Sequence, residues 1–176
     1  TAVQDGDQTL TGWQQVVFYD DAWPRLQACG RWPVTGTAEQ LRQDLAAMDG
    51  VVVTIGHNAV RLEKQRWLQQ CGARLVSVIH PAATVSRFAS IGLGSVVMAG
   101  AVVNIDAALG QACIINTGAT VDHDCRLADG VHVSPGANLS GEVQVGRASW
   151  IGAGAVVRQG LIVGSAVTVG AGAVVV

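Results

Sequence analysis

The chain has 176 residues, of which 49% are hydrophobic and 14% are charged, with a formal net charge of −2. This length allows one or two domains with a sizeable core, and the near-neutral charge speaks against nucleic acid or an anionic membrane surface as a partner. Without a run of eighteen apolar residues or a signal peptide at the start, we expect no membrane insertion and a cytoplasmic location.

The first part of the chain changes character at residue 16. Residues 1–15 are polar and patternless, and we expect a tail or the remnant of a longer segment. The apolar run 16–19 predicts a short strand that ends at Asp20 and Asp21. The sequence T-x-x-Q from Thr37 to Gln40 matches a capping box, which predicts a helix to about residue 48.

Strand and helix patterns then alternate up to residue 80. The apolar run Val51–Ile55 predicts a buried strand, residues 59–70 predict a second helix, and Leu75–Ile79 predicts another strand. Strands that alternate with helices indicate a parallel α/β sheet. We therefore expect a small α/β domain over residues 16–80, Rossmann-like in whole or in part.

Two segments follow strands of this expected sheet and are candidates for ligand binding. Asp20 and Asp21 follow the first strand, and Gly56 follows the strand Val51–Ile55. Ligands of parallel sheets collect at the carboxyl ends of the strands, where an acid accepts hydrogen bonds from ribose and a glycine allows close approach. The alternative is a solvated loop with a turn glycine.

From Ile79 to Val175 an aliphatic residue recurs at every sixth position without a break, and a mostly small residue follows four positions later. A period of six is a multiple of two and falls short of two helical turns, so it fits short strands joined by turns. It predicts a parallel β-helix with triangular coils of about 18 residues over residues 81–176.

This expected prism carries few ionisable groups, so the sequence Asp122-His123-Asp124 stands out. Val121 and Cys125 occupy inward positions, and His123 between them should project outward near a corner. The position stacked against His123 one coil later is Gly141, and a histidine over a glycine leaves a gap large enough for a ligand atom. An adjacent carboxylate fixes the imidazole tautomer and raises its basicity.

Other chemistries remain open for these residues. Convergent histidines on such a prism can bind zinc, but His123 and His132 stand alone after His80, so we expect no metal. Cys125 as a nucleophile conflicts with its inward position. A purely structural role for His123 is the third alternative.

The segments 116–125 (NTGATVDHDC), 131–137 and 139–141 resemble the sialic acid O-acetyltransferase family of hexapeptide acyltransferases, which includes UDP-4-amino-sugar N-acetyltransferases. The likeness extends to Phe18-Tyr-Asp-Asp21, to Ile55-Gly-His-Asn58 with Arg61, and to Ile79-His-Pro81. One departure is that residues 1–15 lack the Gly-rich loop with which members begin. The short segment that usually follows the last coil is also missing.

The resemblance implies a left-handed prism and a role for each matching residue. His123 would be the general base and Asp124 the acid that strengthens it. Acetyl-CoA would contact residues of the prism, namely His132, Gly141, Ala153 and Ala171. The nucleotide-sugar acceptor would contact Asp20, Asp21, Gly56 and Asn116.

We therefore expect an acetyl-CoA-dependent N-acetyltransferase that acts on a nucleotide-linked amino sugar of the UDP-4-amino-4,6-dideoxy type. The family works as homotrimers with acetyl-CoA between two prisms, and we expect the same here. The alternatives are O-acetylation of a sialic acid or another sugar hydroxyl, and an inactive trimeric scaffold.

Overall fold

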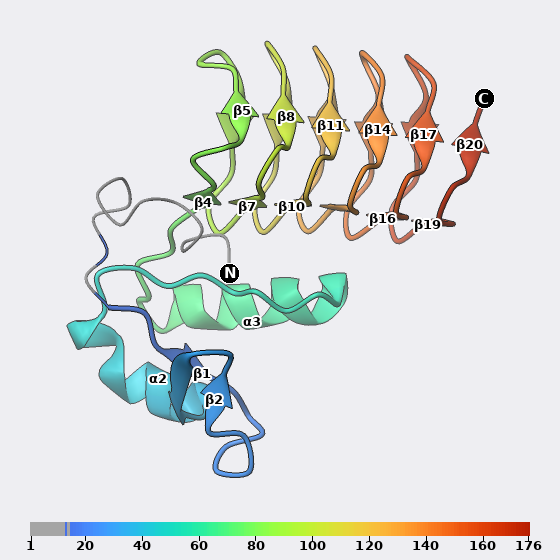
Figure 1. Ribbon diagram of the computed structural model, residues 1–176. Helices are drawn as coiled ribbons and strands as arrows, with labels where there is room; N and C mark the ends of the chain where they lie inside the picture. Colours follow the sequence, from blue (N-terminus) through green and yellow to red (C-terminus); the bar gives the residue numbers. More distant parts are fainter. Residues whose placement is uncertain (1–12, 14) are drawn as a thin grey trace.

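A computed structural model describes residue 13 and residues 15–176. The chain forms a three-sided prism of short parallel strands with a small α/β part on one side (Figure 1). The prism is a left-handed parallel β-helix, so the fold class expected from the sequence is confirmed.

Each face of the prism is one parallel sheet. The first face contains β4 (Val78–Ile79), β7 (Val96–Val97), β10 (Ile114–Ile115), β13 (His132–Val133), β16 (Trp150–Ile151) and β19 (Thr168–Val169). The second face contains β5 (Thr84–Val85), β8 (Val102–Val103), β11 (Thr120–Val121), β14 (Asn138–Leu139), β17 (Val156–Val157) and β20 (Val174–Val175). The third face contains β6 (Ser90–Ile91), β9 (Ala108–Leu109), β12 (Arg126–Leu127), β15 (Gln144–Val145) and β18 (Ile162–Val163).

The strands pair in the register of the sequence repeat. Ile115, for example, pairs with Val97 in the coil before it and with Val133 in the coil after it. The aliphatic and small positions of the repeat fill one continuous core, in which most side chains are fully buried. Ser95 and Ser149 occupy small inward positions and satisfy their hydroxyls on backbone atoms of neighbouring turns.

Four-residue turns join the faces and form three corners. The first corner joins the first face to the second (residues 80–83, 98–101, 116–119, 134–137, 152–155 and 170–173). The second corner joins the second face to the third (86–89, 104–107, 122–125, 140–143 and 158–161). The third corner joins the third face to the first (92–95, 110–113, 128–131, 146–149 and 164–167).

The small part contains a three-stranded sheet in the order β1-β3-β2. β1 (Phe18–Tyr19) is the strand expected over residues 16–19, and it runs parallel to β3 (Trp32–Gly36), a strand that the sequence pattern does not predict. β2 (Ala28–Cys29), also not predicted, forms an antiparallel hairpin with β3. The helix α2 (Ala38–Asp44) begins at the predicted capping box, with both hydrogen bonds of the box formed. The 3-10 helix η1 (Leu45–Ala47) extends it close to the predicted end.

Two expected strands of the small part differ in the structure. The run Val51–Ile55 forms only an isolated parallel bridge, from Val51 to Leu75, although Val53 is buried. The segment after Leu75 leads into β4, which pairs with β7 and already belongs to the prism. An apolar run such as Val51–Ile55 predicts burial, but a strand also needs a neighbouring strand of matching length with which to form backbone hydrogen bonds.

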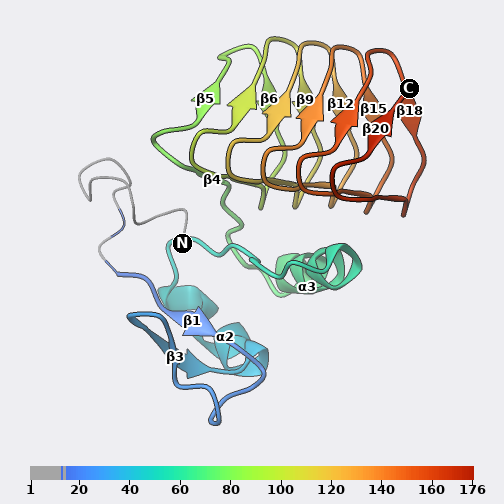
Figure 2. The same cartoon turned by 45° about the vertical axis from the view of Figure 1, so that its right-hand side comes forward.

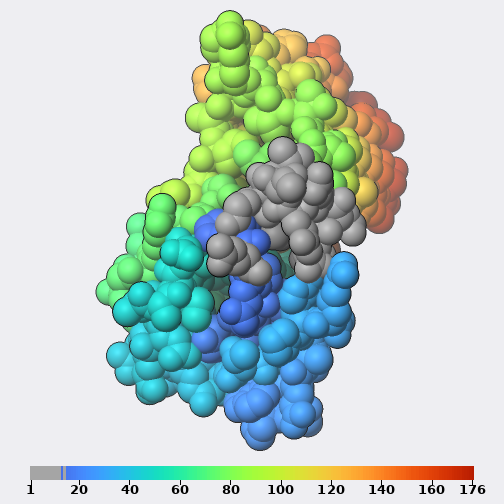
Figure 3. Space-filling view, turned by 60° about the vertical axis from the view of Figure 1, so that its left-hand side comes forward, coloured from blue at the N-terminus to red at the C-terminus, as the bar shows by residue number. Residues whose placement is uncertain are grey.

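The second helix, α3 (Asn58–Gln70), attaches the small part to the third corner, and in Figure 2 the stacked coils lie above it. Its residues Asn58, Arg61 and Gln65 lie on one helical face and donate hydrogen bonds to carbonyls of four successive turns. In the space-filling view the prism, green to red, stands above the small part, blue to cyan (Figure 3). Within the described residues, no helix combines the length and the apolar character needed to cross a membrane.

Candidate active site

His123 projects from the second corner, as expected, and pairs with the residue that follows it. Its Nδ1 lies 2.9 Å from Oδ2 of Asp124, and each side chain is about half exposed. Asp124 adopts the left-handed conformation, with φ of 60°, at the turn between β11 and β12. This conformation, which Asp tolerates better than most residues, places its carboxylate beside the imidazole.

The pair has a defined tautomer when His123 is neutral. Because the carboxylate of Asp124 can only accept, Nδ1 carries the proton and the lone pair is on Nε2. The hydrogen bond that His123 donates to Asp124 raises the pKa of His123, and the charges of Asp122, Asp124 and Glu142 add to that rise. The site therefore contains an exposed imidazole that is more basic than an isolated histidine.

Two further residues hold the turn that carries His123. Oδ1 of Asp122 accepts a hydrogen bond of 2.8 Å from the backbone N–H of His123 and another of 2.8 Å from Nδ2 of Asn104. These two bonds, the first being the larger cause, lower the pKa of Asp122. The sequence signal for this support was the 18-residue spacing between Asn104 and Asp122.

Gly141 lies directly under the imidazole. A Cβ added to this glycine would stand 2.5 Å from both Cε1 and Nε2 of His123. The space expected beside His123 is therefore filled by its own ring, and the glycine is needed for that ring position.

His132 lies elsewhere, in β13 on the first face, with 8% of its surface exposed. Its Nε2 is 3.1 Å from Nδ2 of Asn116, which makes Nε2 the acceptor and Nδ1 the protonated nitrogen. Within the described residues Nδ1 has no hydrogen-bond partner. Burial lowers the pKa of His132 to about 4, so the ring is neutral at pH 7.

Trp150, which the sequence reasoning missed, covers the ring of His132. The two rings are parallel to within 5° with centroids 5.6 Å apart, and Trp150 is 45% exposed. Trp150 follows His132 by 18 residues, and this spacing was the available signal. Ala153 and Ala171 lie in turns of the first corner, next to this face.

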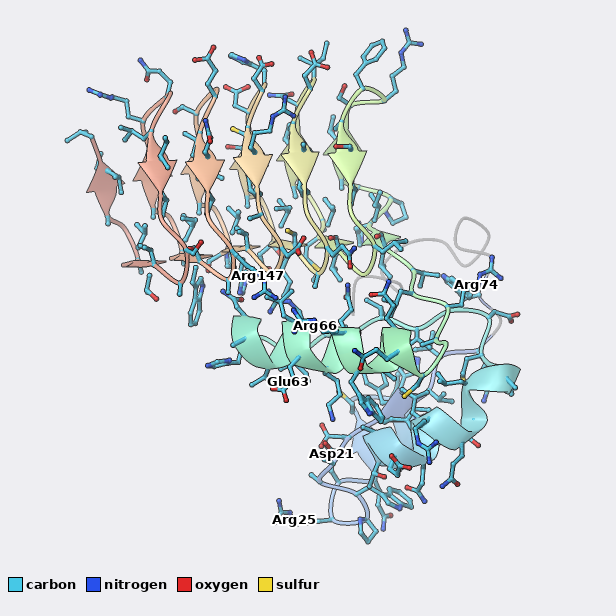
Figure 4. The ribbon with its side chains drawn as sticks, turned by 180° about the vertical axis from the view of Figure 1, so that it is seen from behind. Asp21, Arg25, Glu63, Arg66, Arg74 and Arg147 are labelled. Carbon is cyan, nitrogen blue, oxygen red and sulfur yellow. The ribbon has the colours of Figure 1, made fainter. Side chains whose placement is uncertain are left out.

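The expected acceptor residues of the small part are held differently from one another. Asp20 closes its own turn by accepting from the N–H of Ala22. Asp21 accepts from the N–H of Ala38 at the start of α2, which lowers the pKa of Asp21, and it pairs with Lys64 at 3.3 Å. In Figure 4 Asp21 lies on the side of α3 that faces away from the prism.

Gly56 is exposed in the segment that leads into α3, and a Cβ added there would meet no atom within 4 Å. Its conformation does not require a glycine, so the open space is the feature that stands out. A side chain in this position would point into that space. The space is compatible with a ligand that approaches the backbone.

The expected site residues thus form three groups within one chain. His123, Asp124 and Gly141 lie on the second corner, and His132, Asn116, Ala153 and Ala171 lie on the first face or the first corner. Asp20, Asp21 and Gly56 belong to the part attached at the third corner. Because the second corner is opposite the first face, His123 and His132 of one chain point away from each other.

The cysteines of the prism are buried. Cys113 and Cys125 are fully buried, and burial raises the pKa of both, for Cys113 to about 12. A thiol with a raised pKa is a poor nucleophile. This agrees with the inward position that the repeat predicts for Cys125.

A prism of hexapeptide turns that presents an exposed His-Asp pair, preceded by a small α/β part, is typical of hexapeptide acyltransferases. The model of the PglD N-terminal domain matches residues 3–68. The acetyltransferase domain of PglB from Neisseria gonorrhoeae FA1090, in complex with acetyl coenzyme A, is 46% identical over 93% of this chain and 79% of that chain, with a TM-score of 0.89. The chain belongs to this family of hexapeptide-repeat sugar acetyltransferases.

Two other structures are similar. PerB from Caulobacter crescentus, in complex with CoA and GDP-perosamine, is 41% identical over 85% of this chain and 73% of that chain, with a TM-score of 0.83. WeeI from Acinetobacter baumannii AYE shares the fold, with 22% identity over 86% of this chain and 81% of that chain and a TM-score of 0.62. Comparison with curated proteins gives no match.

Proposed function

We propose that this protein transfers the acetyl group of acetyl-CoA to the amine of a nucleotide-linked amino sugar. The observation that carries the proposal is the pair of His123 and Asp124, 2.9 Å apart on an exposed corner, with Nε2 free to accept a proton. The similar proteins support the substrates, since one is a complex with acetyl coenzyme A and another with CoA and GDP-perosamine.

The reaction follows from a base of this kind. The amine attacks the thioester carbonyl, a C–N bond forms, and the C–S bond breaks to release CoA as the thiolate. His123 Nε2 takes the proton that the amine loses, and Asp124 stabilises the resulting imidazolium. The proton then passes to the CoA thiolate, so no acyl-enzyme forms.

His132 is proposed to orient the acetyl-CoA. Its Nδ1–H is a buried donor without a partner in the described part of the chain, and a thioester carbonyl is an acceptor of suitable size. The hydrogen bond to Asn116 fixes this tautomer. Asn116 would therefore orient His132, in addition to the contact with the acceptor that is expected from the sequence.

The nucleotide is proposed to bind at the small part, near Gly56 and Asp21. The open space at Gly56 supports this place, as does its position after an apolar segment of the α/β part. The sequence resemblance favours UDP as the nucleotide, while the PerB complex contains GDP-perosamine. Comparing the two nucleotides is therefore part of the test.

We further propose that the active site is shared between copies in a homotrimer. His123 and His132 point away from each other in one chain, so one acetyl-CoA reaches both only when the second corner of one prism meets the first face of a neighbour. A closed ring of three copies repeats this heterologous contact three times.

The function is tested by incubating the protein with acetyl-CoA and nucleotide-linked amino sugars and by measuring thiol release and the acetylated product. We expect product with a 4-amino sugar, and a loss of about 10² to 10⁴ in kcat for His123→Ala. Matched sugars with a hydroxyl at the same carbon test O-acetylation. The proposal would be refuted if neither series gave an acetylated sugar and if the rate of CoA release were equal in wild type and His123→Ala.

The shared site is tested by mixing two variants. His123→Ala damages the corner and His132→Ala damages the face, so trimers reassembled from equal amounts of both should regain intact sites at about one quarter of the total. Activity of the mixture equal to the mean of the two variants, or a monomer by light scattering, would contradict the shared site.

A further inference from the structure

Arg61 is a buried cation whose hydrogen-bond partners, within the part of the chain that the structure describes, are all uncharged. Its surface is 0% exposed, and its guanidinium makes five hydrogen bonds. Four of the acceptors are backbone carbonyls and the fifth is the side-chain amide oxygen of Asn58. A buried charge without a counter-ion costs several kcal/mol in desolvation, so about this much must be offset by well-formed hydrogen bonds.

The acceptors belong to two different parts of the molecule. Nη1 donates to the carbonyls of Ile55, at 2.8 Å, and Gly56, at 3.0 Å, in the segment that leads into α3. Nε donates to Ala112 at 2.8 Å and Nη2 to Gly130 at 2.9 Å, in successive turns of the third corner. One side chain thus fastens residues 55–56 to two coils of the prism.

The corner offers these carbonyls because of its turn conformation. Ala112 and Gly130 adopt left-handed conformations, with φ of 54° and 71°. Their N–H groups bond to the preceding turn, whereas their carbonyls accept no backbone hydrogen bond within the described chain. The planar fork of an arginine suits several fixed acceptors at once, and a lysine ammonium does not have this geometry.

Asn58 completes the arrangement. Its Oδ1 accepts from Nη2 of Arg61 at 2.8 Å, while its Nδ2 donates to the carbonyls of Ala148 and Ser149 in the next turn of the corner. Asn58 is itself 8% exposed. The guanidinium therefore has a fixed orientation, set from three turns of the prism.

We infer that Arg61 is a positioning residue that holds the segment 55–57, and with it the nucleotide half of the acceptor, in a fixed place relative to the prism. The substrate in this inference rests on the proposed function, whereas the fixing of residues 55–57 by Arg61 does not depend on it. Gly56, at which we place the nucleotide, is bonded directly to Arg61. Burial and, second to it, the charge of Arg61 lower the pKa of His132, and Arg61→Lys keeps that charge, so we expect the acetyl-CoA contacts of the prism to stay as in wild type.

The test compares Arg61→Lys with Gln65→Ala. Gln65 lies one turn further along the same face of α3 and donates to the carbonyl of Leu93, so its loss weakens the same interface without touching residues 55–57. We expect Arg61→Lys to raise the KM for the acceptor at least about tenfold, because binding must then also order the segment 55–57. The KM for acetyl-CoA should stay as in wild type, and Gln65→Ala should change neither value.

Hydrogen-deuterium exchange provides a readout without substrate. Amides of residues 55–58 should exchange faster in Arg61→Lys than in wild type or Gln65→Ala. Asn58→Ala, which keeps the arginine, should show a smaller effect of the same kind and serves if Arg61→Lys does not fold. If wild type uses no nucleotide sugar, the proposed function fails while the exchange result still decides the role of Arg61.

Two results would overturn the inference. One is an equal rise of both KM values in Arg61→Lys. The other is exchange at residues 55–58 that is the same in Arg61→Lys and Gln65→Ala. Either would mean that Arg61 contributes only to the stability of the interface.

Discussion

The imidazole of His123 rests on Gly141, where an added Cβ would stand 2.5 Å from Nε2. Gly141→Ala should therefore displace the ring and lower kcat by about 10², because the base would no longer face the amine. Gly164→Ala is the matched control, since its added Cβ would make an ordinary contact of 3.5 Å with Val167. Steady-state kinetics of both variants test the prediction, and a normal kcat for Gly141→Ala would contradict it.

Asp124→Asn should weaken the base without disturbing the turn. Asn tolerates the left-handed φ of 60° at this position, so the backbone is kept. The hydrogen bond that His123 donates to the carboxylate of Asp124 is the largest cause that raises the pKa of His123, and losing the carboxylate should lower that pKa. The base is inactive when protonated, so the acidic limb of kcat/KM should move to lower pH while kcat falls by less than in His123→Ala.

Asp106→Asn is the control for this pH profile. Asp106 occupies the same turn position one coil earlier, with φ of 58°, and makes no hydrogen bond to His123. Its profile should match that of wild type. A shift of equal size in both variants would mean that the general negative charge of the corner, rather than the hydrogen bond to Asp124, sets the pKa of His123.

The prism could be predicted from the sequence because each position of its repeat is decided locally. The inward aliphatic position at Ile115 and the small position at Cys113 are both fully buried, as the period of six requires. The stacking of His123 on Gly141 also followed from the 18-residue coil. The hairpin of β2 and β3 could not be predicted because β2 has only two residues and β3 contains a proline and a glycine among its five, so neither strand carries a clear alternating pattern.

The arrangement of the site could be predicted only in part. The sequence identified His123 and His132, and their spacing of nine residues, half of an 18-residue coil, already indicates different points of the prism outline. It does not show that the ring of His132 is buried, because this depends on its contacts with Trp150 and Asn116. Trp150 and Arg61 were not assigned a role, since a tryptophan in a strand and an arginine in a helix are ordinary without their contacts. Their importance arises from packing between segments far apart in the chain.

Ile115→Ala should destabilise the prism. Ile115 is 0% exposed in the core, so its truncation leaves a cavity and costs about 2–5 kcal/mol in the free energy of unfolding. Ile162→Ala, at a residue that is 74% exposed on the third face, should change this free energy by no more than about 0.5 kcal/mol. Denaturant titrations measure both, and a similar loss at Ile162 would indicate that another copy covers it.

Reactivity of the cysteines should follow their burial. Cys29 is exposed and should react with an aromatic disulfide reagent in the native protein, whereas Cys113 and Cys125 should react only after unfolding. Cys125→Ser should keep its activity, because the mechanism uses no thiol and a hydroxyl can donate to the carbonyl of Ser140 as the thiol does. Loss of kcat in this variant with normal stability would reopen covalent catalysis.

His132 should make the stability of the protein depend on pH. Its pKa is about 4 in the folded chain against 6.5 for a free histidine, because burial disfavours the charged ring. Between these values the unfolded chain binds more protons than the folded chain, so the free energy of unfolding should fall as pH is lowered from about 6.5 to 4 and level off below. The full effect is about 3 kcal/mol, from 1.36 kcal/mol for each pKa unit.

His132→Gln should remove this dependence, because the replacement cannot be protonated in this range. Denaturant titrations of wild type and variant from pH 7 to 4.5 should therefore give curves that converge toward low pH, with wild type losing stability faster. His123→Gln is the control: the raised pKa of His123 adds stability below the unfolded pKa that is lost as pH rises through the folded pKa, the opposite direction. If wild type and His132→Gln lose stability in parallel as pH falls, His132 is already hydrated or protonated in the folded state, and its proposed role as a neutral donor to acetyl-CoA fails with it.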